Sequence, residues 1–280
     1  MDRYVVAGNP VQHSQSPFIH ARFAEQTGQA LHYDRLLCPL DGFADTVRRF
    51  ADEGGRGCNV TVPFKFDAFA LAARRTDRAA LAGAANILRF DERNDWLADN
   101  ADGCGLVRDI ERNAGRVLAG QRVLVVGAGG GAAGALGPLL AARPAQLVLA
   151  NRSVDKAQAL VARHAGPARE AGVELRATGL ADCGEAFDVI VNASASSLQG
   201  AGIPVSPRVL RTGALALDMM YGPAAQGFVD WAAQHGAVGR DGLGMLVEQA
   251  GEAFFVWRGV RPDTAPVLAE LQARLSAASR

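Results

Sequence analysis

Apolar residues in the first hundred positions follow two different spacings. Short apolar or alternating runs, typical of strands, are separated by segments whose apolar residues recur every three or four positions, as in helices. Phe43, Val47 and Phe50 form such a helical stripe, with Asp41 as the expected N-cap and Gly54-Gly55 as the expected end. Ser16 as N-cap and Pro17 after it predict another helix start. The expected strands are Tyr4–Ala7, Leu31–Cys38, Gly57–Val62 and Ala84–Phe90.

The alternation continues from Arg122 to the end of the chain. Helical segments separate the expected strands, and the tail predicts two helices, Met245–Gly259 and Asp263–Ala277. Because strands that alternate with helices usually pair in parallel, the expected fold class is α/β with parallel sheets. The strands expected here are Val123–Val126, Leu147–Ala150, Val173–Arg176, Val189–Asn192 and Ala214–Asp218.

The stretch Val123–Ala142 carries no charge and has the length of a membrane span. It contains six glycines and Pro138, and its β-branched residues come first and its alanines later. A strand, a glycine turn and a helix explain this order better than one apolar helix. We therefore expect no membrane segment.

Composition limits the partners and the compartment. The 280 residues, long enough for two domains, include 29 basic and 29 acidic side chains, which gives a formal net charge of zero. Basic residues are scattered, which argues against nucleic acid or an anionic membrane as the main partner. The four cysteines are far apart, form no CxxC pair and follow no signal peptide, so we expect free thiols, a cytoplasmic location and no zinc or other metal.

A glycine-rich loop follows the strand expected at Val123–Val126. Gly127-Ala128-Gly129-Gly130-Gly131-Ala132 matches the dinucleotide-binding pattern, in which the first glycine makes a tight turn and the second admits a pyrophosphate. The helix that follows would stabilise the phosphate charge at its N-terminus. A glycine turn that only packs closely is the alternative interpretation.

The end of the next expected strand indicates which dinucleotide binds. NAD sites usually carry an acidic residue there, whereas this chain has Asn151-Arg152-Ser153, with Lys156 one turn later. A guanidinium and a hydroxyl suit a 2′-phosphate, so NADP is the expected cofactor. Alternatively, these residues form a solvated helix start capped by Ser153.

Asn59-Val60-Thr61-Val62 alternates polar and apolar residues, so Asn59 and Thr61 are expected on one face of a strand that ends before Pro63. Lys65 follows, and with a nicotinamide site elsewhere in the chain it is a candidate for holding or protonating a substrate oxygen. Asp102, on the turn toward the second domain, is its candidate partner. Taken alone, the two residues are equally consistent with a solvated cation and a turn residue.

Eight segments in order resemble the shikimate dehydrogenase family, whose members reduce 3-dehydroshikimate to shikimate with NADPH, in the pathway to aromatic amino acids. Each segment is modest alone, but together they cover nearly the whole chain. They are NPVQHSQSP (Asn9–Pro17), NVTVPFK (Asn59–Lys65), GAANIL (Gly83–Leu88), NADG (Asn100–Gly103), GAGGGAAG (Gly127–Gly134), NRS (Asn151–Ser153), DMMYGP (Asp218–Pro223) and DGLGMLVEQA (Asp241–Ala250).

The resemblance implies roles for individual residues. Lys65 and Asp102 match the catalytic pair. Ser14, Ser16 and Thr61 match positions that receive the substrate carboxylate, and Asn86 and Gln249 match amides that bond its hydroxyls. Asn59 and Tyr221 match further substrate-site positions, and Met219, Gly242 and Met245 match positions at the cofactor. Each also has a plain structural alternative, such as helix capping by Ser16.

Four positions depart from the family pattern. Ala101 and Ile87 stand where threonines are usual, and Ala133 stands where an arginine is common in the glycine loop. Pro138 is expected to interrupt the helix after that loop. These departures bear on cofactor affinity and substrate range more than on the chemistry, since the catalytic pair and the serines are present.

The combined expectation is an N-terminal α/β substrate domain (1–103), a Rossmann-like NADP domain (104–240) and C-terminal helices (241–280) that return to the first domain. A cleft between the domains is expected to bring NADPH and the ketone of 3-dehydroshikimate together. Two alternatives stay open: a broader quinate/shikimate dehydrogenase, and a non-catalytic regulator that binds shikimate or NADP. We expect a monomer or homodimer.

Overall fold

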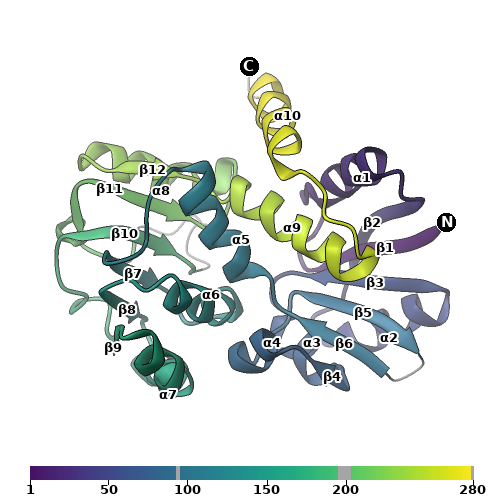
Figure 1. The fold of residues 1–280 in the computed structure, drawn as a ribbon, viewed down its shortest axis with the longest axis horizontal. Helices are drawn as coiled ribbons and strands as arrows, with labels where there is room; N and C mark the ends of the chain where they lie inside the picture. Colours follow the sequence, from purple (N-terminus) through teal and green to yellow (C-terminus); the bar gives the residue numbers. More distant parts are fainter. Residues whose placement is uncertain (93–94, 195–202, 279–280) are drawn as a thin grey trace. The chain divides into compact units, whose positions relative to one another are not determined.

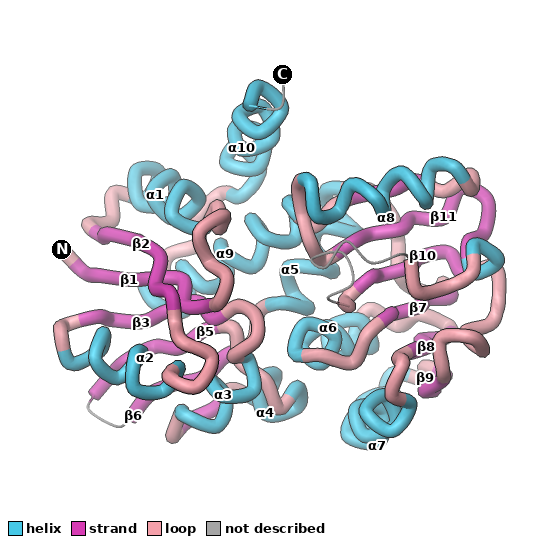
Figure 2. Tube along the Cα trace, turned by 180° about the vertical axis from the view of Figure 1, so that it is seen from behind, coloured by secondary structure: helices cyan, strands magenta, loops and turns pink. Residues whose placement is uncertain are grey.

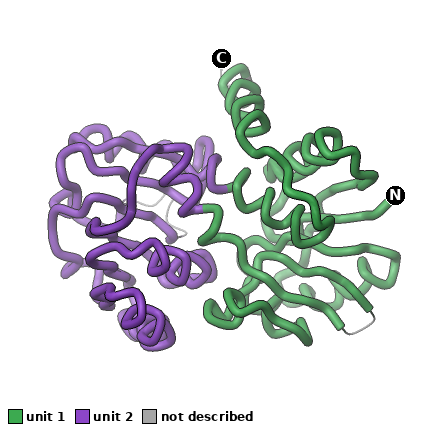
Figure 3. The backbone as a smooth tube through the Cα atoms, viewed as in Figure 1, with its two compact units in different colours: residues 1–105, 246–280 green, residues 106–245 purple. Residues whose placement is uncertain are grey.

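The computed structural model describes residues 1–92, 95–194 and 203–278, which form two compact units (Figure 3). Unit 1 combines two segments, Met1–Gly105 and Leu246–Arg280. Unit 2 is continuous, from Leu106 to Met245. The chain passes from one unit to the other within α5 (Asp102–Arg108) and again within α9 (Leu243–Arg258). The C-terminal helices α9 (from Leu246) and α10 (Thr264–Ala278) therefore belong to the same unit as the N-terminal strands.

Unit 1 contains a six-stranded mixed sheet in the order β2-β1-β3-β5-β6-β4 (Figure 1). Strands β1, β2 and β3 pair in parallel, whereas β5 pairs antiparallel with both β3 and β6. The expectation of parallel sheets is therefore wrong for β5 but confirmed for the other pairs. Only two residues separate β5 from β6, whereas a parallel crossover needs a dozen or more. The strands are β1 (Asp2–Gly8), β2 (Leu31–Leu37), β3 (Gly55–Val60), β4 (Arg74–Arg75), β5 (Ile87–Glu92) and β6 (Asp95–Asp99).

Alternating side chains of this sheet pack into separate apolar clusters. Cys58 and Leu88 share one cluster with Phe43 of α2 (Phe43–Asp52) and with Phe64, the residue before α3 (Lys65–Leu71). Tyr4 and Tyr33 of the parallel strands pack in another cluster with Trp257 of α9, and the rings of Tyr4 and Trp257 stack at 4.6 Å. Alternate residues of a strand point to opposite faces, so both faces of the sheet are covered.

Two expected helix caps in unit 1 are wrong. Helix α1 (Ser16–Thr27) begins at Ser16 itself, with Gln15 at the cap position, and the Ser16 hydroxyl is bonded to Ser14. Helix α2 has Gly42 at its cap position and no side-chain cap, so Asp41 plays no capping role. Pro17 does lie in the first turn of α1, as its fixed φ favours.

Unit 2 is a doubly wound Rossmann sheet. All six strands are parallel, in the order β12-β11-β10-β7-β8-β9, which is the strand order of dinucleotide-binding folds. Helix α8 (Pro223–Gln234) lies against β11 (Figure 2) and also packs against β12. The strands are β7 (Arg122–Val126), β8 (Gln146–Ala150), β9 (Glu174–Thr178), β10 (Phe187–Asn192), β11 (Leu210–Asp218) and β12 (Val238–Arg240).

The uncharged stretch Val123–Ala142 is a strand, a turn and a helix, as expected. Helix α6 (Gly130–Ala141) follows the glycine turn, and α7 (Val154–Ala171) follows β8. The expected interruption at Pro138 is wrong, because α6 continues to Ala141 and buries Leu136, Leu139 and Leu140, which outweighs one lost backbone bond. Within the described ranges, no helix is both long enough and apolar enough to cross a membrane.

Candidate active site

Lys65 and Asp102 form a buried ion pair in unit 1. Lys65 is the first residue of α3, and its Nζ lies 2.8 Å from Oδ1 and 2.6 Å from Oδ2 of Asp102. The Asp102 side chain is 1% exposed, whereas that of Lys65 is 15% exposed. The Asp102 carboxylate is therefore accessible only to protein groups, whereas part of the Lys65 ammonium group is exposed and can contact a ligand.

Asn86 joins this pair to helix α9. Its Nδ2 donates to Asp102 Oδ1 at 3.0 Å and to Gln249 Oε1 at 2.8 Å. Its Oδ1 accepts from the backbone N–H of Ala101 at 2.8 Å. Asn86 is buried, and Gln249 is half-buried with its own amide N–H₂ left to donate elsewhere. Four of the predicted site residues therefore lie in one hydrogen-bonded chain: Lys65, Asp102, Asn86 and Gln249.

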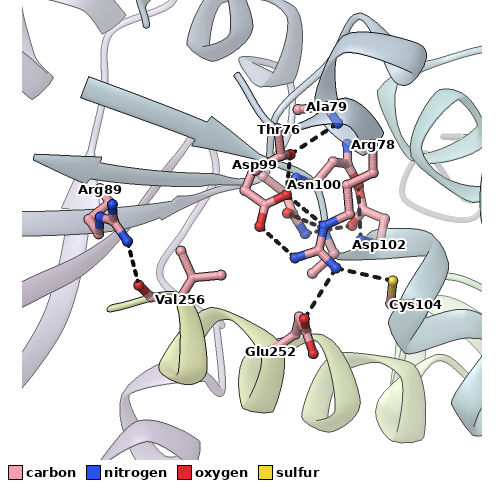
Figure 4. Close-up of polar contacts among 12 residues, drawn as sticks. Thr76, Arg78, Ala79, Arg89, Asp99, Asn100, Asp102, Cys104, Glu252 and Val256 are labelled. Carbon is pink, nitrogen blue, oxygen red and sulfur yellow. Dashed lines mark hydrogen bonds and ion pairs between the residues drawn. The ribbon is translucent and has the colours of Figure 1, made fainter. Parts of the chain in front are cut away.

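The turn that carries Asp102 is held by side chains on both sides. Asn100 Oδ1 accepts from the backbone N–H of Asp102 at 3.0 Å, and Asn100 Nδ2 donates to the Ala84 carbonyl at 2.9 Å. Before it, Asp99 accepts from Arg78 and Thr76 (Figure 4). Arg78 and Asp99 were not predicted as site residues, and no local pattern indicates them.

Ser14 and Ser16 are hydrogen-bonded to each other, whereas Thr61 makes different hydrogen bonds. Ser14 Oγ donates to Ser16 Oγ at 3.1 Å, and Arg35 Nη2 donates to the Ser14 carbonyl at 2.6 Å. Thr61 follows the end of β3 and bonds through its backbone to the Ala7 carbonyl at 3.0 Å. Among the described residues no hydrogen bond joins Thr61 to either serine. The two adjacent hydroxyls form a compact pair of donors suited to a carboxylate.

Asn59 is fixed by two aromatic residues that the sequence analysis missed. Tyr33 Oη donates to Asn59 Oδ1 at 2.7 Å, and His20 Nε2 lies 3.2 Å from the same oxygen. The two rings stack with centroids 4.2 Å apart. His20 is fully buried, and burial lowers its pKa to about 3, so the ring is neutral and donates through Nε2. Its spacing of four from Ser16 is the signal that could have placed both on one helix face.

His20 also has an unusual buried atom. Its Nδ1 has no hydrogen-bond partner among the described residues. Because Asn59 Oδ1 can only accept, the other ring nitrogen is left as an unsatisfied acceptor. The Asn59 amide is consequently held in one orientation, with Nδ2 3.4 Å from the Asn86 carbonyl.

In unit 2 the glycine loop has the geometry of a phosphate cradle. Gly127 has φ of +109°, and a Cβ there would lie 2.8–2.9 Å from backbone atoms of Ala193 and Ser194. Gly129 caps α6, and nothing lies within 4 Å of its own Cβ position, so a ligand can approach the backbone. Gly130 and Gly131 begin the helix, Ala132 is buried beneath it, and Ala128 is half-buried in the loop. These residues fit a dinucleotide pyrophosphate.

Most of the polar residues that follow β8 are exposed. Asn151 Nδ2 donates to the Ser153 carbonyl at 2.9 Å and closes the turn before α7. Ser153 occupies the N-cap position, but its hydroxyl makes no capping bond. The side chains of Arg152 and Lys156 are exposed and have no partner within the described ranges. A free guanidinium and a free hydroxyl at this position fit a 2′-phosphate.

Met219 lies between the glycine loop and the segment before α9. A Cβ on Gly131 would lie 3.1 Å from Met219 Cε, and a Cβ on Gly242 would lie 2.5 Å from the Met219 carbonyl oxygen. Met245 is buried, and Tyr221 lies half-buried between β11 and α8 in the same unit. The predicted residues Gly131, Met219 and Gly242 are therefore brought together at the carboxyl end of β11.

Two buried residues at strand ends of unit 2 were missed. Asn192 ends β10 and Asp218 ends β11, and Asn192 Nδ2 donates to Asp218 Oδ2 at 2.8 Å. Asp218 Oδ1 accepts from the backbone N–H of Met220 at 2.8 Å. These bonds shape the segment that carries Met219. Asp218 belongs to the DMMYGP segment, so its position was noticed but its role was not.

Three of the four departures from the family pattern are core positions. Ile87 and Ala101 are fully buried and share one apolar cluster with Ala253 of α9. At these two positions, where the family usually has threonine, this chain therefore has apolar side chains that pack in one buried cluster. Ala133 is buried inside α6. Of these three residues, none presents an exposed side chain to a ligand.

Family models match three parts of the chain. They are described as "Shikimate dehydrogenase substrate binding domain" for residues 6–88, "Shikimate / quinate 5-dehydrogenase" for 109–199 and "Shikimate 5'-dehydrogenase C-terminal domain" for 242–272. A curated protein of Methylibium petroleiphilum, named shikimate dehydrogenase (NADP(+)), is 65% identical over 283 residues, covering 99% of this chain and 96% of that protein.

Solved structures agree with these sequence matches. An Ael1 enzyme from Pseudomonas putida is 46% identical, with a TM-score of 0.85 over 97% of this chain and 98% of that chain. Shikimate 5-dehydrogenase from Thermus thermophilus, solved in complex with shikimate, is 28% identical, with a TM-score of 0.83 over 99% of this chain and 100% of that chain.

Proposed function

The chain belongs to the shikimate dehydrogenase family, and on that premise we propose that Lys65 and Asp102 are its catalytic pair. The protein is an NADP-dependent oxidoreductase that interconverts 3-dehydroshikimate and shikimate, a step of aromatic amino acid biosynthesis. The observation that carries the proposal is the buried pair itself, in which Asp102 is 1% exposed and Lys65 is the partly exposed member.

The predicted substrate residues bind different groups of the substrate. Ser14 and Ser16, with Thr61, receive the carboxylate, while Asn86 and Gln249 bond the ring hydroxyls. Asn59, held by Tyr33 and His20, orders the site, and Tyr221 is a further substrate residue. Lys65 holds the ketone oxygen, and Asp102 orients the ammonium group. As the oxygen gains charge during reduction, the Lys65–Asp102 pair stabilises it and supplies its proton.

The cofactor residues belong to unit 2. NADPH supplies the hydride for the reduction. Gly127, Gly129 and the N-terminus of α6 hold the pyrophosphate, and Arg152, Ser153 and Lys156 hold the 2′-phosphate. Asn151 shapes this turn, and Met219, Gly242 and Met245 form the wall beside the nicotinamide.

Rates with two substrates and two cofactors test this assignment. We expect kcat/KM to be highest for shikimate with NADP, and lower for quinate or NAD. Comparable rates with quinate would support the broader quinate/shikimate dehydrogenase instead. Binding of shikimate or NADP without turnover would indicate a regulator and overturn the catalytic proposal.

The four cysteines support a cytoplasmic location. All four are free thiols, and Cys38, Cys58 and Cys183 are buried. Free thiols persist in a reducing compartment, so we place the enzyme in the cytoplasm, as a monomer or homodimer with a small-molecule substrate and no nucleic acid partner. Light scattering of the purified protein would distinguish monomer from homodimer.

A further inference from the structure

We propose that Arg78 is a positioning residue for the catalytic pair, because its guanidinium ties the turn that carries Asp102 to the helix that carries Gln249. This inference rests on the proposed function, since it assigns Arg78 a role only through Asp102 and Gln249. Arg78 lies on α4 (Asp77–Ala82) and belongs, like all its partners, to unit 1.

The first contact of Arg78 is a two-pronged ion pair with Asp99. Nε donates to Oδ1 at 2.6 Å and Nη2 donates to Oδ2 at 2.5 Å (Figure 4). The Asp99 side chain is 3% exposed and that of Arg78 27%. Two parallel bonds fix the plane of the carboxylate as well as its position, which a single lysine contact cannot do.

Asp99 passes this constraint to the turn. Its Oδ1 accepts from the backbone N–H of Asn100 at 2.7 Å and from Thr76 Oγ1 at 2.6 Å. Asn100 Oδ1 in turn accepts from the backbone N–H of Asp102 at 3.0 Å. The three residues before the catalytic carboxylate are therefore fixed by side-chain bonds, and Arg78 anchors the first of them.

The second contact of Arg78 reaches helix α9. Nη1 donates to Glu252 Oε1 at 3.2 Å, and Glu252 also pairs with Arg261 at 2.7 Å. Glu252 lies three residues after Gln249, so the two side chains leave neighbouring positions of one helix face. A single guanidinium therefore ties the segment before Asp102 to the helix of Gln249, and so supports the bridge that Asn86 makes between the two.

The charges in this cluster balance. Arg78 and Arg261 face Asp99 and Glu252, and both acids are buried. Burial opposes the charge on Arg78, but its bonds to Asp99 hold the pKa of the guanidinium above its usual range. Arg78 therefore stays charged, and Arg78→Lys keeps a positive charge while it removes the two-pronged geometry.

Arg89 offers a matched control for a purely structural role. It also links the sheet to α9, through Nη1 to the Val256 carbonyl at 3.1 Å (Figure 4). Like Arg78, it pairs with an acid, Asp91. None of its contacts within the described ranges reaches the Asp102 turn. Arg89→Gln therefore removes a tie between sheet and α9 without touching the catalytic pair.

The test is a double-mutant cycle between Arg78→Lys and Asp102→Asn, measured as kcat with saturating shikimate and NADP. We expect R78K to lower kcat about tenfold or more, since displacement of a catalytic group by about 1 Å costs up to about 10²-fold. In the D102N background the same change should lower kcat less than about twofold, because the positioned carboxylate is gone. KM for NADP should stay constant, and R89Q should leave kcat nearly unchanged.

Loss of kcat by the same factor in both backgrounds would overturn the proposal, as would an equal loss in R89Q. If R78K fails to fold, Asp99→Asn enters the same cycle, because it keeps the shape and the bond to Asn100 but weakens the ion pair. D102N alone separates the two hypotheses. Normal kcat in D102N would reject the catalytic pair and this inference with it, whereas a large loss without coupling to Arg78 would reject this inference only.

Discussion

The two units prepare their ligand sites in opposite ways. In unit 1 the proposed substrate-site side chains are bonded to one another, from Lys65 through Asp102 and Asn86 to Gln249. In unit 2 the backbone of the glycine loop is the fixed element, and Arg152 and Lys156 extend into solvent without partners among the described residues.

This difference fits the proposed task of each unit. The proposed role of Lys65 needs a charged group held in one place, and the members of the unit 1 network hold one another through shared hydrogen bonds. Phosphate recognition tolerates mobile cations, because the helix N-terminus and the loop N–H groups already give the position. Substitutions in unit 1 should therefore be coupled, and those in unit 2 should be local.

The largest effect is expected at Lys65. Lys65→Ala should lower kcat by about 10²-fold or more, the usual scale for a positioned acid–base group. Steady-state kinetics should show little change in KM for NADP. The chain has only one other lysine, Lys156, and Lys156→Ala is the matched control, which should keep its kcat. Normal turnover in a folded Lys65→Ala variant would remove Lys65 from the mechanism.

Lys65→Arg sharpens the same test. Arginine keeps the positive charge and can pair with Asp102, but it does not give up a proton at ordinary pH. Turnover close to that of the unmodified protein would mean that charge stabilisation suffices, whereas a loss close to that of the alanine variant would indicate proton transfer from the ammonium group.

The second largest effect is expected at Arg152, in the exposed cofactor site proposed for unit 2. Charge-assisted hydrogen bonds contribute about 1.5–3 kcal/mol each, so Arg152→Ala should reduce the preference for NADP over NAD tenfold or more. The rate with NAD should change little, and so should the melting temperature, because the side chain is exposed and has no partner in the part of the chain that the structure describes. An equal loss of kcat/KM with both cofactors would show that Arg152 does not act through the 2′-phosphate.

A smaller effect is expected at Ser14. Ser14→Ala removes one hydroxyl donor to the substrate carboxylate and also the bond to Ser16, so KM for shikimate should rise by an amount equivalent to about 0.5–3 kcal/mol. KM for NADP should not change. Unchanged apparent affinity for shikimate would place the carboxylate elsewhere. Ser206→Ala, at a turn of unit 2, is the control.

The smallest effect concerns acid stability through His20. Burial lowers its pKa from 6.5 to about 3, so between these values the unfolded chain binds one proton more than the folded chain. The free energy of unfolding should fall by about 1.4 kcal/mol per pH unit below about 6.5 from this residue. In urea denaturation, the free energy of unfolding should decrease less between pH 7 and pH 5 for His20→Asn than for the unmodified protein. The exposed His32→Asn is the control, and a slope unaltered in His20→Asn would contradict the assignment.

Local patterns predicted most of unit 2 from the sequence. Strands β7, β8 and β10 are apolar runs buried on both faces. The spacing of the glycines between β7 and α6 is typical of dinucleotide-binding loops. The strand order was not readable from the pattern, but parallel pairing was. The effect of Pro138 was misjudged, because burial of α6 is a tertiary contribution. The three-residue strand β12 and the bond between Asn192 and Asp218 were missed, because both depend on neighbouring strands.

Unit 1 was less predictable because its decisive contacts join distant residues. Strand β4 has two residues, and β6 is short, so both depend on their neighbours in the sheet rather than on their own pattern. The family resemblance indicated Lys65 and Asp102, and the structure brings them together. It could not indicate Arg78, His20 or Tyr33, whose significance lies in what they touch.

Unit 1 is discontinuous in sequence, and this affects how it can be completed during synthesis. Lys65 and Asp102 leave the ribosome well before Gln249 and Glu252, with the continuous unit 2 made in between. At about 5–20 residues per second, the interval of roughly 150 residues lasts on the order of ten seconds. During that time Asp99 and Arg78 can pair, but α9 is still missing from the apolar face formed by Tyr4 and Tyr33. The nascent chain can therefore acquire a folded nucleotide-binding unit before it has a finished substrate site.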